Sequence, residues 1–158
     1  MKKVLFQEIK RPYTDILILI VFLILCNTFF LYQYFTSIII LIPLDIGLLF
    51  ILVTMRLKII IFENSIKYKF TPYHFYWREL KLEGCYDYEI KEYNAIQDYK
   101  GVGRRFLTYK NEKAYLTDYN GFALQLKDKY GFTFTFGIRN HHQLQQILPK
   151  LKNSPNPI

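Results

Sequence analysis

The chain begins with two apolar runs and changes to an alternation of polar and apolar residues after them. The runs Ile16–Tyr32 and Ile38–Met55 hold one formal charge between them, that of Asp45. A helix that spans a membrane needs about 20 predominantly apolar residues. The segments 15–35 and 37–55 have about this length, and only a short stretch separates them. The sequence therefore predicts a transmembrane hairpin of two antiparallel helices.

Basic residues flank both outer ends of the predicted hairpin, and its tip has none. Because Lys and Arg near span ends remain on the cytoplasmic side, both termini are expected in the cytoplasm. The protein is then a multi-pass protein of the bacterial inner membrane, with the lipid bilayer as its first partner. The flanking residues are Lys2, Lys3, Lys10, Arg11, Arg56 and Lys58.

Two polar residues, Asn27 and Asp45, fall at a similar depth in the predicted hairpin. An acid inside a membrane is costly and often marks function. One interpretation is structural: Asp45 forms a hydrogen bond to Asn27 or Thr28 across the hairpin, or to another protomer, so a homo-oligomer or a membrane protein partner is expected. The alternative is a small transporter or channel component that uses Asp45 to handle ions. A single acid in two helices favours the structural interpretation.

From Leu57 onward, apolar residues recur at every second position, which is typical of half-buried strands. Turn-forming residues between neighbouring strands predict two hairpins, one around Glu63 and Asn64 and one around residues 128–131. About seven strands result. They are expected at residues 57–62, 65–70, 75–80, 86–90, 113–119, 122–126 and 132–136.

The pattern changes to a helical period near the end of the chain. Asn140 is a suitable N-cap for a helix through 141–151, and Leu144, Ile147, Leu148 and Leu151 form one apolar stripe on it. The predicted organisation is a basic flank and hairpin over 1–56, a β-rich domain over 57–151, and a frayed tail over 152–158. The fold class is α+β, with an antiparallel barrel or sandwich closed by the C-terminal helix.

This order of elements is similar to that of small bacterial membrane proteins with a two-helix hairpin before a pleckstrin-homology-like domain. The residues that carry the resemblance are the hairpin 61–70, the loop 98–105 (DYKGVGRR), the strand 120–126 (NGFALQL) and the segment 136–138 (FGI). Val102 stands where such proteins usually have Trp between the glycines. Most of these proteins lack an assigned activity, so the resemblance implies an architecture rather than a function.

The net charge of +8 lies mostly after the second apolar run. A basic domain beside a membrane suggests attraction to anionic lipid head groups, although such charges also solvate a surface. The two cysteines, Cys26 and Cys85, are in different segments and predict neither a disulfide nor a zinc site. His141 and His142 are adjacent and point to different helix faces. No cofactor or metal is therefore expected.

A ligand or head-group site is predicted around two groups of residues. The glycines of Gly101-Val102-Gly103 would let backbone N–H groups approach an anion, and two guanidinium groups follow directly. Most loops of this kind are simply turns that need positive φ. Two further basic residues alternate along the strand 65–70. The predicted site comprises Lys67, Lys69, Gly101, Gly103, Arg104 and Arg105.

The sequence shows no catalytic signature. It has no nucleophile elbow, no phosphate-binding loop motif and no supported triad, and its acidic pairs lie in charged strands. The aromatic residues fall on the inward parity of strands and are expected in the core, which argues against nucleic acid binding. The sequence therefore predicts a non-enzymatic integral membrane protein that displays a cytosolic module for a protein partner or lipid head groups.

Overall fold

The computed structural model describes residues 3–11, 14–31, 43, 46–47, 49–51, 53–82, 85–128 and 130–152. The chain divides into two compact units. One unit is continuous in sequence, from Pro12 to Met55, and the other combines Met1–Arg11 with Arg56–Ile158. The predicted tail 152–158 lies outside the described residues, except for Lys152.

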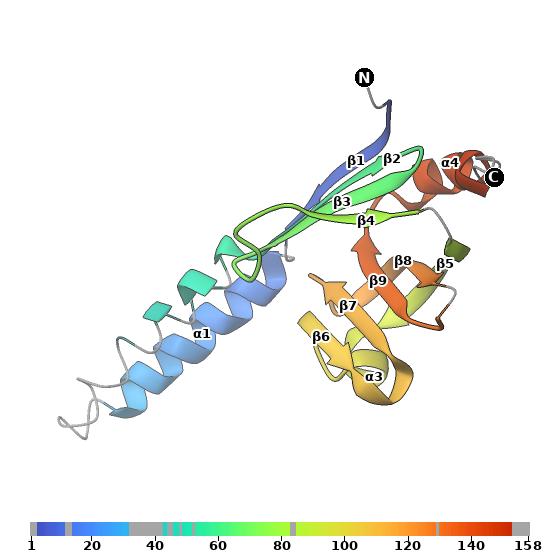
Figure 1. Cartoon of the computed structure of the whole chain (residues 1–158). Helices are drawn as coiled ribbons and strands as arrows, with labels where there is room; N and C mark the ends of the chain where they lie inside the picture. Colours follow the sequence, from blue (N-terminus) through green and yellow to red (C-terminus); the bar gives the residue numbers. More distant parts are fainter. Residues whose placement is uncertain are drawn as a thin grey trace. The chain divides into compact units, whose positions relative to one another are not determined.

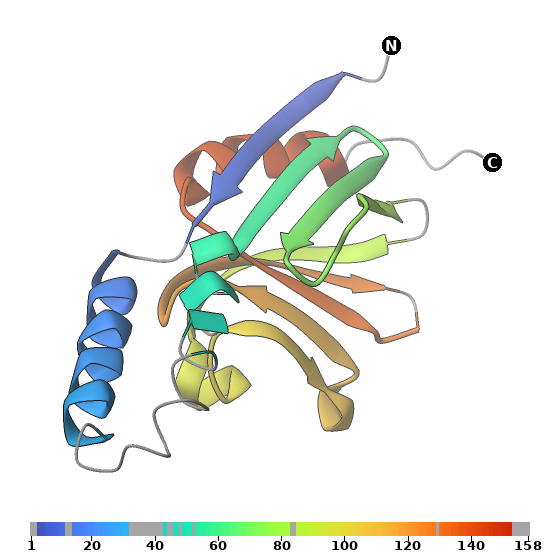
Figure 2. The same cartoon turned by 90° about the vertical axis from the view of Figure 1, so that its left-hand side faces the viewer.

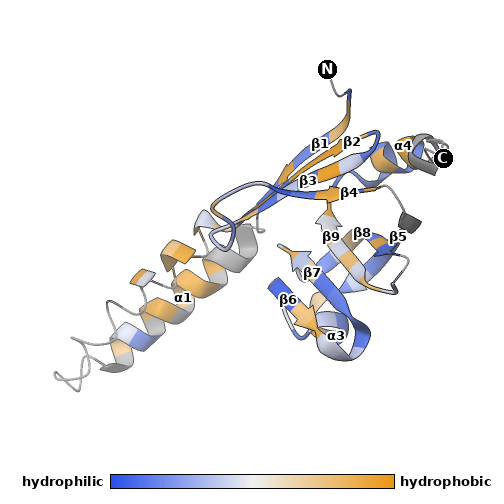
Figure 3. Ribbon diagram, viewed as in Figure 1, coloured by the Kyte–Doolittle hydropathy of each residue, from blue (hydrophilic) through white to orange (hydrophobic). Residues whose placement is uncertain are grey.

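The unit Pro12–Met55 contains helix α1, Thr14–Leu31. Large apolar side chains of α1, among them Phe22, Leu25 and Phe29, are exposed, and in Figure 3 the described part of this helix is predominantly hydrophobic. Of the residues that the structure describes within the predicted second span, 43, 46–47, 49–51 and 53–54 are helical. Among the described residues, no helix combines the length and the apolarity that crossing a bilayer requires.

The prediction of a transmembrane hairpin is therefore wrong, and so are the predictions that depend on it. Integral membrane function, a multi-pass inner-membrane location, a bilayer partner and ion transport through Asp45 lose their basis. Asp45 lies outside the described residues, and Asn27 is exposed on α1.

The N-terminal residues form a strand rather than a basic flank. Strand β1, Val4–Lys10, pairs antiparallel with β2, Arg56–Phe62, and Lys10 lies opposite Leu57. Along the sequence, the unit Pro12–Met55 therefore connects β1 to β2, although these two strands are paired neighbours in one sheet. The apolar run that begins shortly after Lys10 hid this strand from sequence analysis, because the strand is short and its partner begins 46 positions later (56 − 10).

The first sheet has the order β1-β2-β3-β4 (Figure 1). Strand β3, Ser65–Thr71, forms a hairpin with β2, which confirms the predicted turn at Glu63 and Asn64. Strand β4 covers only Arg78–Lys81, so the first half of the predicted strand 75–80 is instead a loop. Phe75, Tyr76 and Trp77 of this loop are exposed.

The second sheet has the order β5-β8-β9-β7-β6. The predicted hairpin around 128–131 is present between β8 and β9. Strand β9 inserts between β8 and β7 and runs parallel to β7. The parallel pair and the two separate sheets contradict the predicted seven-stranded antiparallel barrel. The strands are β5 Cys85–Asn94, β6 Gly103–Leu107, β7 Glu112–Leu116, β8 Asn120–Asp128 and β9 Thr133–Ile138.

Three short helical elements complete this unit. Helix α3, Ala95–Tyr99, lies on the face of the second sheet that is turned away from the first sheet, as both views show (Figures 1 and 2). A 3₁₀ turn, Thr108–Lys110, links β6 to β7. Helix α4, His141–Lys152, occurs where the helical period predicted it and contacts β1 and β5.

The main core lies between the two sheets and is aromatic. Tyr115 and Phe136 of the second sheet stack with their ring centroids 5.4 Å apart, and Tyr68 of β3 packs 4.9 Å from Phe136. Phe70 is fully buried beside them. This core occupies the inward face of the second sheet, so its outward face is left for α3 and for polar side chains.

Candidate functional site

A polar cleft lies on the outward face of the second sheet, beside α3. Its volume is about 460 Å³. Strands β5, β7, β8 and β9 contribute to its lining, together with α3 and the 3₁₀ turn. The lining residues are Asp87, Glu89, Lys91, Asp98, Tyr99, Lys110, Glu112, Gln125, Lys127, Gly131 and Thr133.

The floor of the cleft follows from strand register. Glu112 of β7 lies opposite Thr133 of β9, Thr133 lies opposite Lys127 of β8, and Lys127 lies opposite Asp87 of β5. Residues that are directly opposite in a sheet share a face. The four side chains therefore form one row across four strands, which we call the Glu112 row.

Glu112 is the buried member of this row, with 4% of its surface exposed. Its Oε1 atom accepts hydrogen bonds from Tyr99 Oη at 2.9 Å, from Gln125 Nε2 at 3.0 Å and from the Thr135 hydroxyl. All three donors are neutral. Among the described residues, the second carboxylate oxygen, Oε2, has no hydrogen-bond partner. The carboxylate is thus held firmly by one oxygen while the other remains available to the cleft.

Local backbone structure at the start of β7 positions Glu112. The preceding residue, Asn111, adopts a left-handed conformation with φ 47° and ends the 3₁₀ turn. Asparagine tolerates this conformation better than most residues. The Asn111 carbonyl accepts a hydrogen bond from Thr133 N at 2.9 Å. This bond joins the turn to β9 and places Glu112 directly beside Thr133.

Helix α3 positions Tyr99, the donor above Glu112. Asn94 caps the helix, because its side chain accepts hydrogen bonds from Ile96 N and Gln97 N, both at 3.0 Å. Asp98 accepts a hydrogen bond from Asn94 N at 2.9 Å in return. Such reciprocal capping fixes the start of a short helix. Tyr99, Ala95 and Val102 then pack against Ala114 and Leu116 of β7.

The tyrosine in this arrangement remains a hydrogen-bond donor. Burial has the largest effect and raises the pKa of Tyr99 above its usual value near 10. The Thr135 side chain, which has the next largest effect, lowers this pKa, and the negative charges of Glu112 and Asp98 raise it further. The phenol therefore stays protonated at neutral pH. The Tyr99–Glu112 contact is a fixed hydrogen bond and does not provide a proton that exchanges with a substrate.

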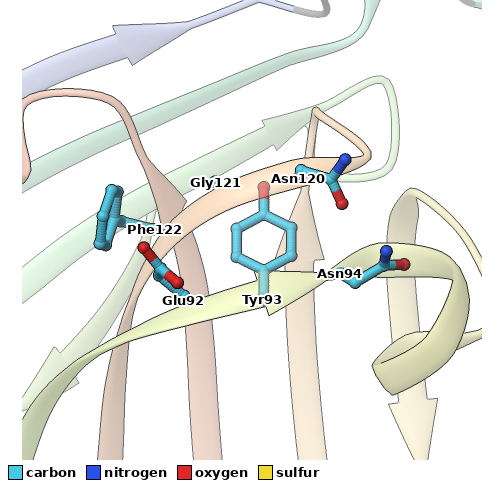
Figure 4. Close-up of a pocket in the computed structure, with 6 residues that line it drawn as sticks. All are labelled: Glu92, Tyr93, Asn94, Asn120, Gly121 and Phe122. Carbon is cyan, nitrogen blue, oxygen red and sulfur yellow. The ribbon is translucent and has the colours of Figure 1, made fainter.

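A second hollow of about 450 Å³ lies at the other end of β5 and β8 (Figure 4). Tyr93 crosses β8 at Gly121 there, and Glu92, Asn94, Asn120 and Phe122 complete the lining. The Asn94 side chain already caps α3, and the Tyr93 hydroxyl donates to the Asp118 carbonyl at 3.4 Å. Several of its polar groups thus already serve the fold.

A buried ion pair lies close to this second hollow. Lys10 Nζ is 2.7 Å from Asp118 Oδ2, both side chains are 3% exposed, and the same Nζ donates to the Ile138 carbonyl at 3.1 Å. On the same strand, the two oxygens of Glu8 accept hydrogen bonds from Arg139 N and Asn140 N at the start of α4. Glu8, rather than the predicted Asn140 side chain, caps this helix. Strand β1 thereby joins the two sheets and α4.

The structure does not bring the sequence-predicted ligand residues together. Lys100 caps the C-terminal end of α3, and Gly101 follows it with a φ of 121°, whereas Gly103, with a φ of 103°, is the first residue of β6. Gly101 N donates to the Ala95 carbonyl at 2.7 Å and Lys100 N to the Ile96 carbonyl at 3.1 Å. Because these amides are used by the helix end, they are not directed at an anion.

The basic residues of the predicted site also diverge. Arg104 and Arg105 are neighbours on β6 and point to opposite faces of the sheet, and Arg105 Nε donates to the Val102 carbonyl at 3.0 Å. Lys67 and Lys69 share the outer face of the first sheet, and Lys69 Nζ donates to the Phe75 carbonyl at 2.7 Å. Anion binding by these groups stays a prediction, without a common site.

The buried histidine, His74, has a structural setting. Its ring packs against Tyr68 and Tyr115, and its Nδ1 accepts a hydrogen bond from Phe70 N at 3.3 Å. Burial lowers the pKa of His74, and the charges of Arg78 and Arg104 lower it further. The ring is therefore neutral at neutral pH. Within the described residues, no group of three or more His, Cys, Asp and Glu side chains is arranged to hold a metal ion.

Comparisons of the chain with protein-family models, with curated proteins and with solved structures found no match. The resemblance to pleckstrin-homology-like proteins therefore stays a prediction.

Sequence analysis missed Glu112 because its neighbours made it look like a surface charge. It stands between Lys110 and Lys113 in a charged segment. One signal was present: Glu112 shares the parity of Ala114 and Leu116, which are small or apolar and buried. That parity indicates a covered face, but only the position of α3 shows what covers it.

Proposed function

We propose that this protein is a non-catalytic binding module that holds a small polar ligand in the cleft above the Glu112 row. The observation that carries the proposal is the Glu112 carboxylate, which is buried in the cleft with three neutral donors on Oε1 and an open acceptor at Oε2. Burying an ionised group is costly unless an opposite charge or hydrogen bonds stabilise it. A ligand that enters the cleft supplies a hydrogen-bond donor to the second oxygen of Glu112.

The lining supports binding better than catalysis. Ligand sites combine a concave surface with a few well-placed polar groups, and Tyr99, Gln125 and Thr135 are held by hydrogen bonds rather than left free to react. The raised pKa of Tyr99 makes it a poor proton donor to a substrate at neutral pH. A rigid, prearranged acceptor is what recognition requires.

Nuclear magnetic resonance with the full chain tests the proposal. A library of small polar molecules is titrated while the backbone amide signals are followed. We expect binders to shift amides of residues 87–91, 110–113 and 125–133, and to leave those of the inter-sheet core unchanged.

Two matched variants control this test. Thr133→Trp places a large side chain in the Glu112 row and is expected to abolish the shifts, whereas Lys67→Ala changes a charge on the other sheet and is expected to preserve them. Shifts that survive Thr133→Trp, or a library without a single binder, would contradict the proposal.

A further inference from the structure

The charges of the cleft specify the kind of ligand, an inference that rests on the proposed function. The cleft is lined by four acids, Asp87, Glu89, Asp98 and Glu112, and by three lysines. Their charges nearly balance, so the lining as a whole favours neither a simple anion nor a simple cation. These charged side chains differ in burial, however. Glu112 is buried, whereas Lys91, Lys110 and Lys127 are exposed.

The buried acid calls for a cationic partner. Its Oε2 is an acceptor with no donor among the described residues, and no positive group contacts Oε1. A divalent metal ion needs several oxygen ligands, and no such cluster occurs in the described part of the chain. An ammonium or guanidinium group satisfies the single oxygen and forms a charge-assisted hydrogen bond.

The exposed lysines call for an anionic group at a fixed distance from that cation. Lys127 lies in the Glu112 row, two strands away from Glu112 through Thr133. With neighbouring strands about 4.8 Å apart, the two backbones are roughly 10 Å apart. The side chains reach into the space between them. A short chain of a few carbon atoms can therefore place its cation at Glu112 and its anion at Lys127.

We infer that the cleft binds a small zwitterion, with its ammonium or guanidinium group at Glu112 Oε2 and its carboxylate or phosphate group at Lys127. Asp87 lies opposite Lys127 at the far end of the row. Tyr99 closes the cation site from above and is a positioning residue.

Three matched probes test the inference: 4-aminobutanoate, butylamine and butanoate, each titrated into the full chain at constant ionic strength. We expect 4-aminobutanoate to bind at least 10-fold more tightly than butylamine, and butanoate to cause no shifts in the cleft. Glu112→Gln keeps the shape and the acceptor of hydrogen bonds but removes the charge. It is expected to weaken binding of both amines at least 10-fold.

Lys127→Met tests the contribution of the anionic end of the ligand separately from that of the cationic end. The affinity for 4-aminobutanoate is expected to fall to that for butylamine, and the affinity for butylamine is expected to stay unchanged. Equal binding of butanoate and 4-aminobutanoate, or amine binding that Glu112→Gln does not alter, would overturn the inference. If none of the three probes binds while neutral or anionic library members still shift the cleft amides, the zwitterion inference fails and the proposed function stands. If nothing binds in the cleft, both fail.

Discussion

Two buried acids, Glu112 in β7 and Asp118 in the turn that follows β7, illustrate two uses of a carboxylate. Asp118 is paired with Lys10 at 2.7 Å, and the pair is closed off from solvent at the junction of β1 with the second sheet. Glu112 has only neutral donors on Oε1 and borders an open cleft. The first acid is compensated by the chain itself. The second is held in place without a counter-charge, which is the property expected of a recognition site.

The largest difference between the two acids should appear when the partner of Asp118 is removed. Lys10→Met leaves the Asp118 charge buried and unpaired, and we expect it to lower the free energy of unfolding by about 3–5 kcal/mol. The double variant Lys10→Met with Asp118→Asn removes both charges and is expected to recover most of this loss. Chemical denaturation measures both values. A single variant that costs less than about 1 kcal/mol would show that the pair does not hold β1.

A smaller effect is expected at Glu8, a third buried acid, which bonds to backbone groups. Its oxygens accept from Arg139 N at 2.8 Å and Asn140 N at 3.1 Å. Glu8→Ala leaves these N–H groups at the start of α4 without their acceptor, and we expect a loss of about 2 kcal/mol in the free energy of unfolding.

The exposed Gln7, which alternates with Glu8 on the same strand, provides the control for this change. Gln7→Ala should alter stability by less than about 0.5 kcal/mol. Equal effects of the two substitutions in chemical denaturation would mean that Glu8 contributes only as a strand residue and not as a helix cap.

These contacts also explain how much of the fold could be predicted. The β2–β3 and β8–β9 hairpins are local, and their alternation and turn residues were sufficient to find them. Strand β1 pairs with a strand beyond the whole unit Pro12–Met55, and no local pattern records such a pairing. The uniform apolarity of the first run was interpreted as a membrane span, because a run without a period does not identify what it packs against.

The candidate site was harder to predict than the fold. The composition of the glycine–arginine loop is typical of anion sites, yet Gly101 follows the cap of α3, Gly103 begins β6 and the two arginines diverge. Glu112 depends on three donors from α3, β8 and β9. These donors are 13 to 23 positions away in sequence, so their convergence follows from the parallel β7–β9 pairing and the position of α3, neither of which the sequence pattern indicated.

The pH dependence of stability probes the hydrogen bond above Glu112. Because burial raises the pKa of Tyr99 above its usual value near 10, the folded state keeps the phenol proton that the unfolded state loses above that pH. Its contribution is complete below pH 10 and is lost as pH rises towards the folded pKa. We expect the free energy of unfolding to fall by about 1.4 kcal/mol per pH unit for this group.

In Tyr99→Phe the free energy of unfolding should fall less steeply at alkaline pH, by about 1.4 kcal/mol per pH unit. It also removes one donor from Glu112, which should cost about 1 kcal/mol at neutral pH. Denaturation curves between pH 8 and pH 11 measure both effects. Tyr130→Phe, a change at an exposed tyrosine, is measured beside it as the control. An unaltered slope in Tyr99→Phe would contradict the buried donor role.

The smallest effect on stability is expected at Glu112 itself, and it completes the comparison with Asp118. Glu112→Gln retains an oxygen that accepts from Tyr99, Gln125 and Thr135, and no cation among the described residues is left unpaired by the change. We expect the free energy of unfolding to shift by less than about 1 kcal/mol, although Glu112 is buried as deeply as Asp118. Chemical denaturation of Glu112→Gln beside Lys10→Met measures the contrast directly. If Glu112→Gln destabilised the protein as much as Lys10→Met does, the Glu112 charge would have a structural partner within the chain. The inference that an external cation binds at Glu112 would then fail.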